Sequence, residues 1–150
     1  MRRFLVIFDN MPIDKASVKS GQNSLEVITA CRCVNVGLFI SGNLRRDVVI
    51  SIAIGDVEDM KIFSFPGDTL KRVSPDERSI SFFLLKAIEK ALDLELGKSF
   101  TMDNGIEIER TQLSQLIERW GSDIVQVPST KPERFILDTN LEADKMENEP

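Results

Sequence analysis

The sequence has 150 residues, 42% apolar and 29% charged, which is typical of one globular domain with its own hydrophobic core. Two cysteines and no histidine argue against a disulfide-stabilised fold and exclude histidine-containing metal sites and the Ser-His and Cys-His catalytic pairs. No apolar run approaches the roughly 18 residues of a membrane-spanning helix, and the apolar stretch near the start is too short for a signal peptide. We therefore expect a cytoplasmic protein that does not contact membranes.

The formal net charge of -5 is unevenly distributed along the chain. Residues 138–150 hold five acids and one lysine, so they contribute -4 and residues 1–137 contribute only -1. Seven of the ten arginines lie within the first 78 residues. A local basic surface is therefore compatible with the acidic composition, and the net charge does not decide the partner.

The first half of the chain predicts two buried strands around one helix. "RRFLVIF" (2–8) reads as a strand, and residues 9–23 read as a loop. Ser24 can cap a helix that continues to about Ser41, because apolar residues recur at helical spacing. The β-branched run 48–56 predicts a strand buried on both faces, and 60–65 predicts a shorter strand after a tight acidic turn.

The second half contains the strongest local signal, "SPDER" (74–78). Ser74 as N-cap, Pro75 at the first helical position and Glu77 three residues after the cap predict a helix that ends near Leu92. We then expect a strand in "GIEIER", a short helix capped by Thr111, and a last strand in "RFIL" (134–137).

Alternating strands and helices favour an α/β fold with a largely parallel sheet and flanking helices. We expect one domain over residues 1–137 and an acidic tail over residues 138–150. Because parallel strands are normally covered by crossover helices, a final strand followed by a polar tail suggests that the domain is incomplete.

The only cysteines, Cys31 and Cys33, fall within the first predicted helix. Residues i and i+2 of a helix point about 200° apart, so these thiols can neither bridge each other nor share a metal ion. We interpret them as packing residues.

Two polar stretches are candidates for a site. "LRRD" places Arg45, Arg46 and Asp47 at the entry to a buried strand, where adjacent arginines suit phosphate or carboxylate recognition. The alternative is a solvated turn with a surface ion pair. In "SPDER", capping accounts for most residues, and the helix N-terminus could also bind an anion.

In chain order, the blocks 31–54, 69–92 and 103–110 resemble the TrmY family, the tRNA pseudouridine N1-methyltransferases of the SPOUT superfamily. The resemblance implies a SPOUT-like α/β fold with a C-terminal trefoil knot, an exception to unknotted topology. It also implies a homodimer that binds S-adenosylmethionine in the knot and methylates N1 of a pseudouridine in the tRNA T-loop, at position 54, without a metal.

The resemblance also assigns roles to residues. It implies that Arg46 holds phosphate or base, that Asp47 positions or accepts the N1 proton, and that Arg45 lies beside them near the substrate. Substrate-binding residues in the second block would be Asp76, Glu77 and Arg78.

The C-terminal segment departs from the family pattern. Leu137 matches a family leucine that contacts the methyl donor, but the later donor-binding loop and closing helix have no counterpart. We therefore expect a truncated methyltransferase that lacks most of its cofactor pocket. The alternatives are a non-catalytic RNA-binding or interaction remnant of the family, or a metal-independent hydrolase that uses Asp47 and Asp76.

Overall fold

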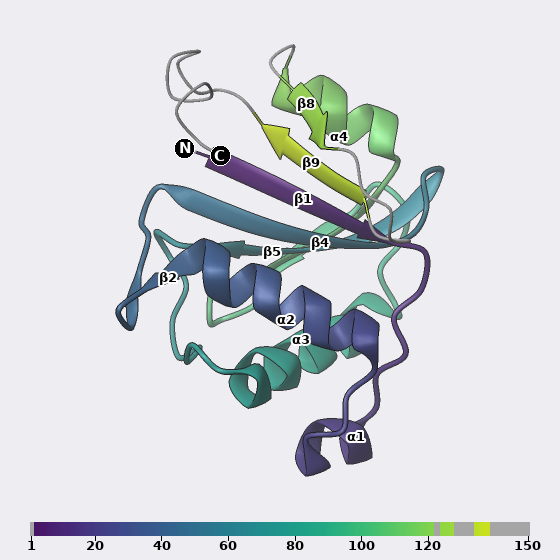
Figure 1. Ribbon diagram of the computed structural model, residues 1–150. Helices are drawn as coiled ribbons and strands as arrows, with labels where there is room; N and C mark the ends of the chain where they lie inside the picture. The colour runs from purple at the N-terminus through teal and green to yellow at the C-terminus, as the bar shows by residue number, and fades with distance from the viewer. Residues whose placement is uncertain (1, 122–123, 128–133, 139–150) are drawn as a thin grey trace.

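The computed structural model describes residues 2–121 and the backbone of residues 124–127 and 134–138 (Figure 1). Seven of the described strands form one sheet in the order β6-β7-β5-β4-β1-β9-β8. These strands are β1 (Arg2–Phe8), β4 (Val48–Asp56), β5 (Asp59–Pro66), β6 (Ser99–Thr101), β7 (Glu107–Thr111), β8 (Ile124–Val127) and β9 (Arg134–Asp138). Strands β2 (Phe39–Ile40) and β3 (Asn43–Leu44) form a separate hairpin.

The helices cover both faces of this sheet. They are α1 (Lys15–Ser20), α2 (Leu25–Leu38), α3 (Glu77–Ala91) and α4 (Leu113–Trp120). Helices α2 and α3 lie against one face, and α4 lies on the other (Figure 1). The mixed α/β class with flanking helices is confirmed.

The prediction of a largely parallel sheet is wrong. Strands β1 and β4 pair in parallel, whereas every other pairing between the described strands of the sheet is antiparallel. The tight turn between β4 and β5 places Asp59 opposite Asp56, and a connection this short can join only antiparallel strands. Strand β9 then returns antiparallel to β1, with Leu137 opposite Phe4.

Alternation along the strands sends side chains into two cores. Even-numbered residues of β1 and β4, such as Val6 and Ile52, pack beneath α2 and α3. Odd-numbered residues, such as Leu5, Ile7 and Ala53, pack against α4. Both faces of the central strands are therefore buried, as their apolar runs predicted.

The structure confirms β1 and β4 at their predicted bounds and the start of α2. Ser24 caps α2, because its hydroxyl oxygen accepts a hydrogen bond from the Val27 N–H at 3.4 Å. The helix ends at Leu38, three residues before the predicted Ser41, because the backbone is already extended at Phe39 (φ -108°, ψ 133°), where strand β2 begins.

Other elements differ from the predictions. Residues 9–23 are not all loop, since Asp14 caps the short helix α1. Thr111 does not cap α4: it ends β7, and its hydroxyl donates to the Gln115 side chain at 3.1 Å. The short strands β6 and β8 were not predicted. Asp138, which we placed in the tail, belongs to β9, and residues 139–150 lie outside the described residues.

Within the part of the chain that the structure describes, no helix has the length and apolarity needed to cross a membrane. The same residues contain no group of three or more acidic or cysteine side chains placed to bind a metal ion.

Candidate functional site

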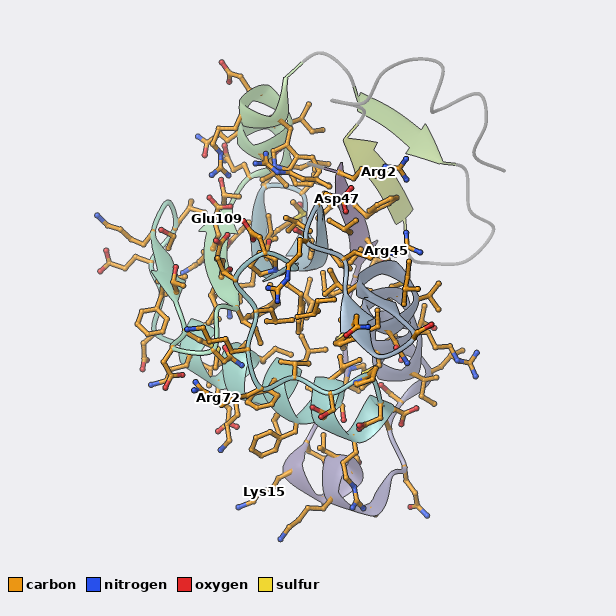
Figure 2. All side chains as sticks on the ribbon, turned by 90° about the vertical axis from the view of Figure 1, so that its left-hand side faces the viewer. Arg2, Lys15, Arg45, Asp47, Arg72 and Glu109 are labelled. Carbon is orange, nitrogen blue, oxygen red and sulfur yellow. The ribbon has the colours of Figure 1, made fainter. Side chains whose placement is uncertain are left out.

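The loop that carries Arg45, Arg46 and Asp47 is fixed at one end of the sheet. The Arg45 N–H donates to the Leu38 carbonyl oxygen at 2.6 Å, which attaches the loop to the end of α2. The Arg2 N–H donates to the Asp47 carbonyl oxygen at 2.8 Å, which attaches it to β1. Figure 2 shows Arg2, Arg45 and Asp47 at this end of the molecule.

Gly67 lets a second loop pack directly against the first. A Cβ atom built on Gly67 would overlap the Arg45 carbonyl oxygen and would lie 3.0 Å from the Val48 carbonyl oxygen. The Gly67 N–H also donates to that Val48 oxygen at 2.8 Å. Any side chain at position 67 would therefore push the two loops apart.

The exposed side chain of Arg46 lies across this second loop. Its Nη1 donates to the Asp68 carbonyl oxygen at 3.1 Å and, at 3.4 Å, to that of Gly67. These contacts orient the guanidinium group, and they leave its other N–H donors available for a phosphate or base. Arg46 lines a hollow of about 490 Å³ that also includes Lys71.

Asp47 is exposed, and in the described part of the chain its carboxylate makes no hydrogen bond or ion pair. A carboxylate without a structural partner beside an oriented arginine is available to accept a proton or a hydrogen bond from a bound group.

Arg45 is half-buried, and its Nε–H has no hydrogen-bond partner among the described residues. A buried donor left unpaired costs about 1–3 kcal/mol. The unpaired donor marks Arg45 as a group that an added acceptor would stabilise.

Three expected site residues lie at the start of α3, and Ser74 is not the N-cap. Asp76 holds that position, because its Oδ1 accepts from the Ser79 N–H at 2.8 Å and the helix begins at Glu77. A carboxylate is the stronger acceptor at a helix N-terminus, since it also interacts favourably with the helix dipole. Ser74 contributes its backbone N–H, which donates to the Ser79 hydroxyl oxygen at 2.9 Å.

Glu77 and Arg78 connect α3 to the neighbouring helices. Glu77 Oε2 accepts from the Asn23 side chain at 3.0 Å, and Arg78 Nη2 donates to the Lys19 carbonyl oxygen at 3.0 Å. Arg45, Arg46 and Asp47 thus share one loop by their adjacency in the sequence, whereas Asp76, Glu77 and Arg78 contact α1, α3 and the segment before α2.

Leu137 lies at the same end of the sheet as Asp47. Its backbone pairs with Phe4, and Phe4 pairs with Ile50, three residues after Asp47. Strand β9 thus brings residue 137 within two strands of the Arg45–Asp47 loop.

An apolar cavity of about 340 Å³ lies between α2 and the strands β1 and β4, lined by Phe4, Val6, Arg32, Cys33, Val36, Gly37 and Ile50. Its volume is within the range of small-molecule sites. Its only ionised side chain is Arg32, and it offers no carboxylate for a sulfonium, an amino group or ribose hydroxyls. The lining of this cavity alone therefore does not form a complete site for S-adenosylmethionine.

Sequence reasoning missed Gly67, Lys71 and Arg72. Gly67 follows Pro66 at the end of a strand, a dipeptide typical of a turn. Lys71 and Arg72 lie in the second family block, just before "SPDER". Two adjacent basic residues were the signal from which the sequence could have identified them.

Comparison with known proteins identifies the family. A family profile described as "Putative SAM-dependent RNA methyltransferase" matches residues 1–126, which include the Arg45–Asp47 loop and the start of α3. The chain belongs to this family. The predicted relationship to TrmY proteins is thereby confirmed.

Three relatives in this family are named tRNA (pseudouridine(54)-N(1))-methyltransferase. The Methanocella arvoryzae protein is 32% identical over 151 aligned positions, which cover 91% of this chain and 77% of the relative. The Haloferax volcanii protein is 30% identical over 131 positions, covering 85% and 64%. A Methanococcus maripaludis protein is 43% identical over 88 positions, covering 58% and 43%.

The chain spans about half the length of several relatives that it matches, with shares of 43%, 52% and 64%. The residues matched by the family profile include the Arg45–Asp47 loop and the sheet end that supports it.

Proposed function

We propose that this chain contributes the substrate side of a tRNA pseudouridine(54) N1-methyltransferase that uses S-adenosylmethionine, in a cytoplasmic SPOUT-type homodimer. The observation that carries the proposal is the family match over residues 1–126, which includes the exposed Arg46–Asp47 pair. The names of the relatives support pseudouridine 54 of tRNA as the target.

Pseudouridine differs from uridine in the atom that links base to sugar. Its base is attached through carbon, so N1 carries a hydrogen, whereas N1 of uridine is bonded to ribose. When bound, S-adenosylmethionine supplies an electrophilic methyl group. The protein has to position the nucleotide and remove the N1 proton.

In this proposal Arg46 holds a phosphate or the base next to the Asp47 carboxylate, which accepts the N1 proton. Arg45 supports the loop through its backbone N–H, which donates to the Leu38 carbonyl oxygen. Asp76, Glu77 and Arg78 are secondary candidates for substrate contact, and their contacts with neighbouring residues give them a supporting role in the fold. Leu137 remains the proposed contact to the methyl donor.

The test is transfer of labelled methyl from S-adenosylmethionine to tRNA that carries either pseudouridine or uridine at position 54. We expect any transfer to go only to the pseudouridine tRNA, and absence of transfer to either tRNA would favour the second candidate below. Asp47→Asn is expected to reduce transfer at least 100-fold with little change in tRNA affinity. Asp56→Asn, a matched change at the opposite end of β4, is the control. Equal transfer to both tRNAs would contradict the proposal.

A second candidate is an RNA-binding protein of the same family without catalysis. It is favoured by the apolar cavity, whose lining does not form a complete cofactor site. Salt-sensitive tRNA binding without methyl transfer, weakened by Arg46→Ala, would support this alternative.

A further inference from the structure

Two hollows lie next to each other on the side of the molecule that carries Arg46. The hollow of about 490 Å³ contains Arg46 and Lys71, and a second of about 650 Å³ contains Arg72, Lys86 and Lys90. Met102 and Asp103 line both hollows, so the two are adjacent. We refer to Arg46, Lys71, Arg72, Lys86 and Lys90 as the basic groove.

The backbone fixes the middle of the basic groove. The Lys71 N–H donates to the Asn104 carbonyl oxygen at 2.8 Å. Gly105 (φ 100°) lets the two segments approach closely, because a Cβ there would lie 2.9 Å from the Thr69 carbonyl oxygen. Arg72 has a left-handed backbone (φ 63°), which is unfavourable for a residue other than glycine. Such strain is found most often at functional positions.

The positively charged side chains of the groove form only weak ion pairs, or none, with the described residues. Lys86 and Lys90 are exposed and one helical turn apart on α3, and within the described residues neither has a carboxylate within 4 Å. The Arg72–Asp103 ion pair measures 3.6 Å, and its side chains are 59% and 92% exposed, so it contributes little to stability. A phosphate group can therefore displace the Asp103 carboxylate from Arg72.

Exposed aromatic rings lie beside the two lysines, outside the linings of the two hollows. Lys86 Nζ lies 5.5 Å from the Phe82 ring centre, and Lys90 Nζ lies 5.9 Å from that of Phe100. The two phenylalanines are 44% and 47% exposed. Positive charge beside exposed aromatic rings is typical of surfaces that bind single-stranded nucleic acid.

Asn104 adds an unsatisfied donor in the wall of the second hollow. Its Oδ1 accepts from the Ile106 N–H at 3.2 Å, whereas its buried Nδ2 has no hydrogen-bond partner among the described residues.

From these observations we propose that the basic groove binds the phosphate backbone of the tRNA on one side of the target nucleotide. This inference rests on the proposed function, because it takes the Arg46–Asp47 loop as the position of that nucleotide. Four carboxylates also line the two hollows: Asp68, Glu89, Asp93 and Asp103. Their negative charge opposes RNA binding there. Removing negative charge should therefore strengthen binding, and removing positive charge should weaken it.

The experiment measures tRNA affinity of the full chain by fluorescence anisotropy over a series of salt concentrations. Lys86→Glu/Lys90→Glu is expected to weaken tRNA binding roughly tenfold at low salt. The number of ions released on binding, read from the salt dependence of the affinity, should fall by more than one. Glu89→Gln/Asp93→Asn is expected to strengthen binding, an effect that misfolding cannot produce. The matched control is Lys15→Glu/Lys19→Glu, the same change at the same spacing on α1.

The outcomes separate the two proposals. If Arg46→Ala weakens tRNA binding while both groove variants bind like the parent chain, the groove proposal is overturned and the proposed function stands. If the control on α1 weakens binding as much as the change on α3, the effect is general charge repulsion, and the groove proposal again fails. If the parent chain does not bind tRNA, both proposals fail.

Discussion

The two cysteines show how burial determines the chemistry of a side chain. The Cys31 thiol is 2% exposed and lies 3.9 Å from the Glu77 carbonyl oxygen, to which it donates. Burial, with smaller effects from Glu77 and Cys33, raises the pKa of Cys31 to about 12. The thiolate required for metal binding or disulfide exchange is therefore absent near neutral pH, and Cys31 connects α2 to the start of α3.

Gly67 has the most restricted space at the candidate site. We expect Gly67→Ala to lower the free energy of unfolding by about 2–3 kcal/mol, because the new methyl group would overlap the Arg45 carbonyl oxygen. It should also weaken tRNA binding, since the overlap displaces the loop of Arg46. Urea denaturation and anisotropy measure the two effects.

Gly97→Ala is the control for this change. Gly97 has a positive φ (87°), but a Cβ there would meet no atom within 4 Å, so only backbone strain of about 1 kcal/mol applies. Equal losses of stability in the two variants would contradict the role of close packing at Gly67.

For single helices and strands, the hydrophobic periodicity and the burial of the strands were predictable from the sequence. Which of two neighbouring residues caps a helix was not. The β-branched run of β4 and the Ser24 cap were found from the sequence because each depends on adjacent residues. The start of α3 depended instead on which of two nearby side chains caps the helix, and the Asp76 carboxylate does so by accepting from the Ser79 N–H. The Arg45–Asp47 loop was identified as a candidate site, but its support by Gly67 depends on contacts between distant segments.

The two caps can be separated by substitution. We expect Asp76→Ala to lower the free energy of unfolding by about 1 kcal/mol, because the Ser79 N–H loses its acceptor. Ser74→Ala should change it by less than about 0.5 kcal/mol, since Ser74 contributes through its backbone. Denaturation by urea compares the variants, and a larger effect at Ser74 would restore it as the functional cap.

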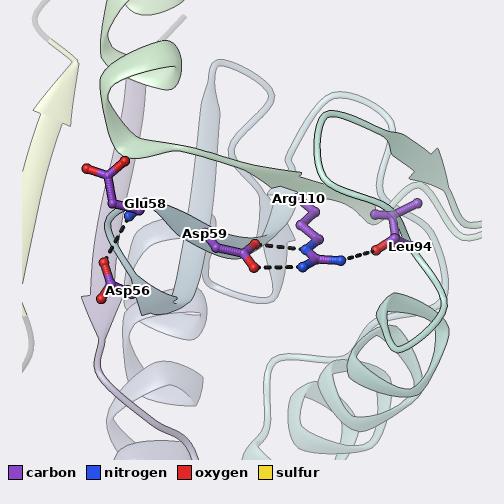
Figure 3. A network of polar contacts seen from close by, with 5 residues as sticks. All are labelled: Asp56, Glu58, Asp59, Leu94 and Arg110. Atoms are coloured by element: carbon purple, nitrogen blue, oxygen red, sulfur yellow. Dashed lines mark hydrogen bonds and ion pairs between the residues drawn. The ribbon is translucent and has the colours of Figure 1, made fainter.

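At the scale of the whole molecule, the two ends of the sheet have different roles. Strand β4 runs from Val48 beside the candidate site to Asp56 at the other end, roughly 26 Å away. There Arg110 donates to Asp59 through two bonds, at 2.8 and 2.7 Å, and to the Leu94 carbonyl oxygen at 2.9 Å (Figure 3). This group joins β5 and β7 to the segment after α3, at the end of the sheet opposite the candidate site.

The Asp59–Arg110 pair predicts a dependence of stability on acid. The hydrogen bonds from Arg110 lower the pKa of Asp59 below its ordinary value of 3.8. Because the pKa is lower in the folded state, the stabilisation is complete above the unfolded value and is lost as the pH falls through the folded value. Asp59→Asn should therefore flatten the decline of unfolding free energy below about pH 4, measured by urea denaturation at successive pH values.

Asp14, whose pKa is lowered by the Ser17 N–H at the start of α1, provides the comparison. Asp14→Asn should flatten the same range while leaving the contacts of Arg110 intact. An Asp59→Asn profile parallel to that of the parent chain would show that the pair does not couple protonation to folding.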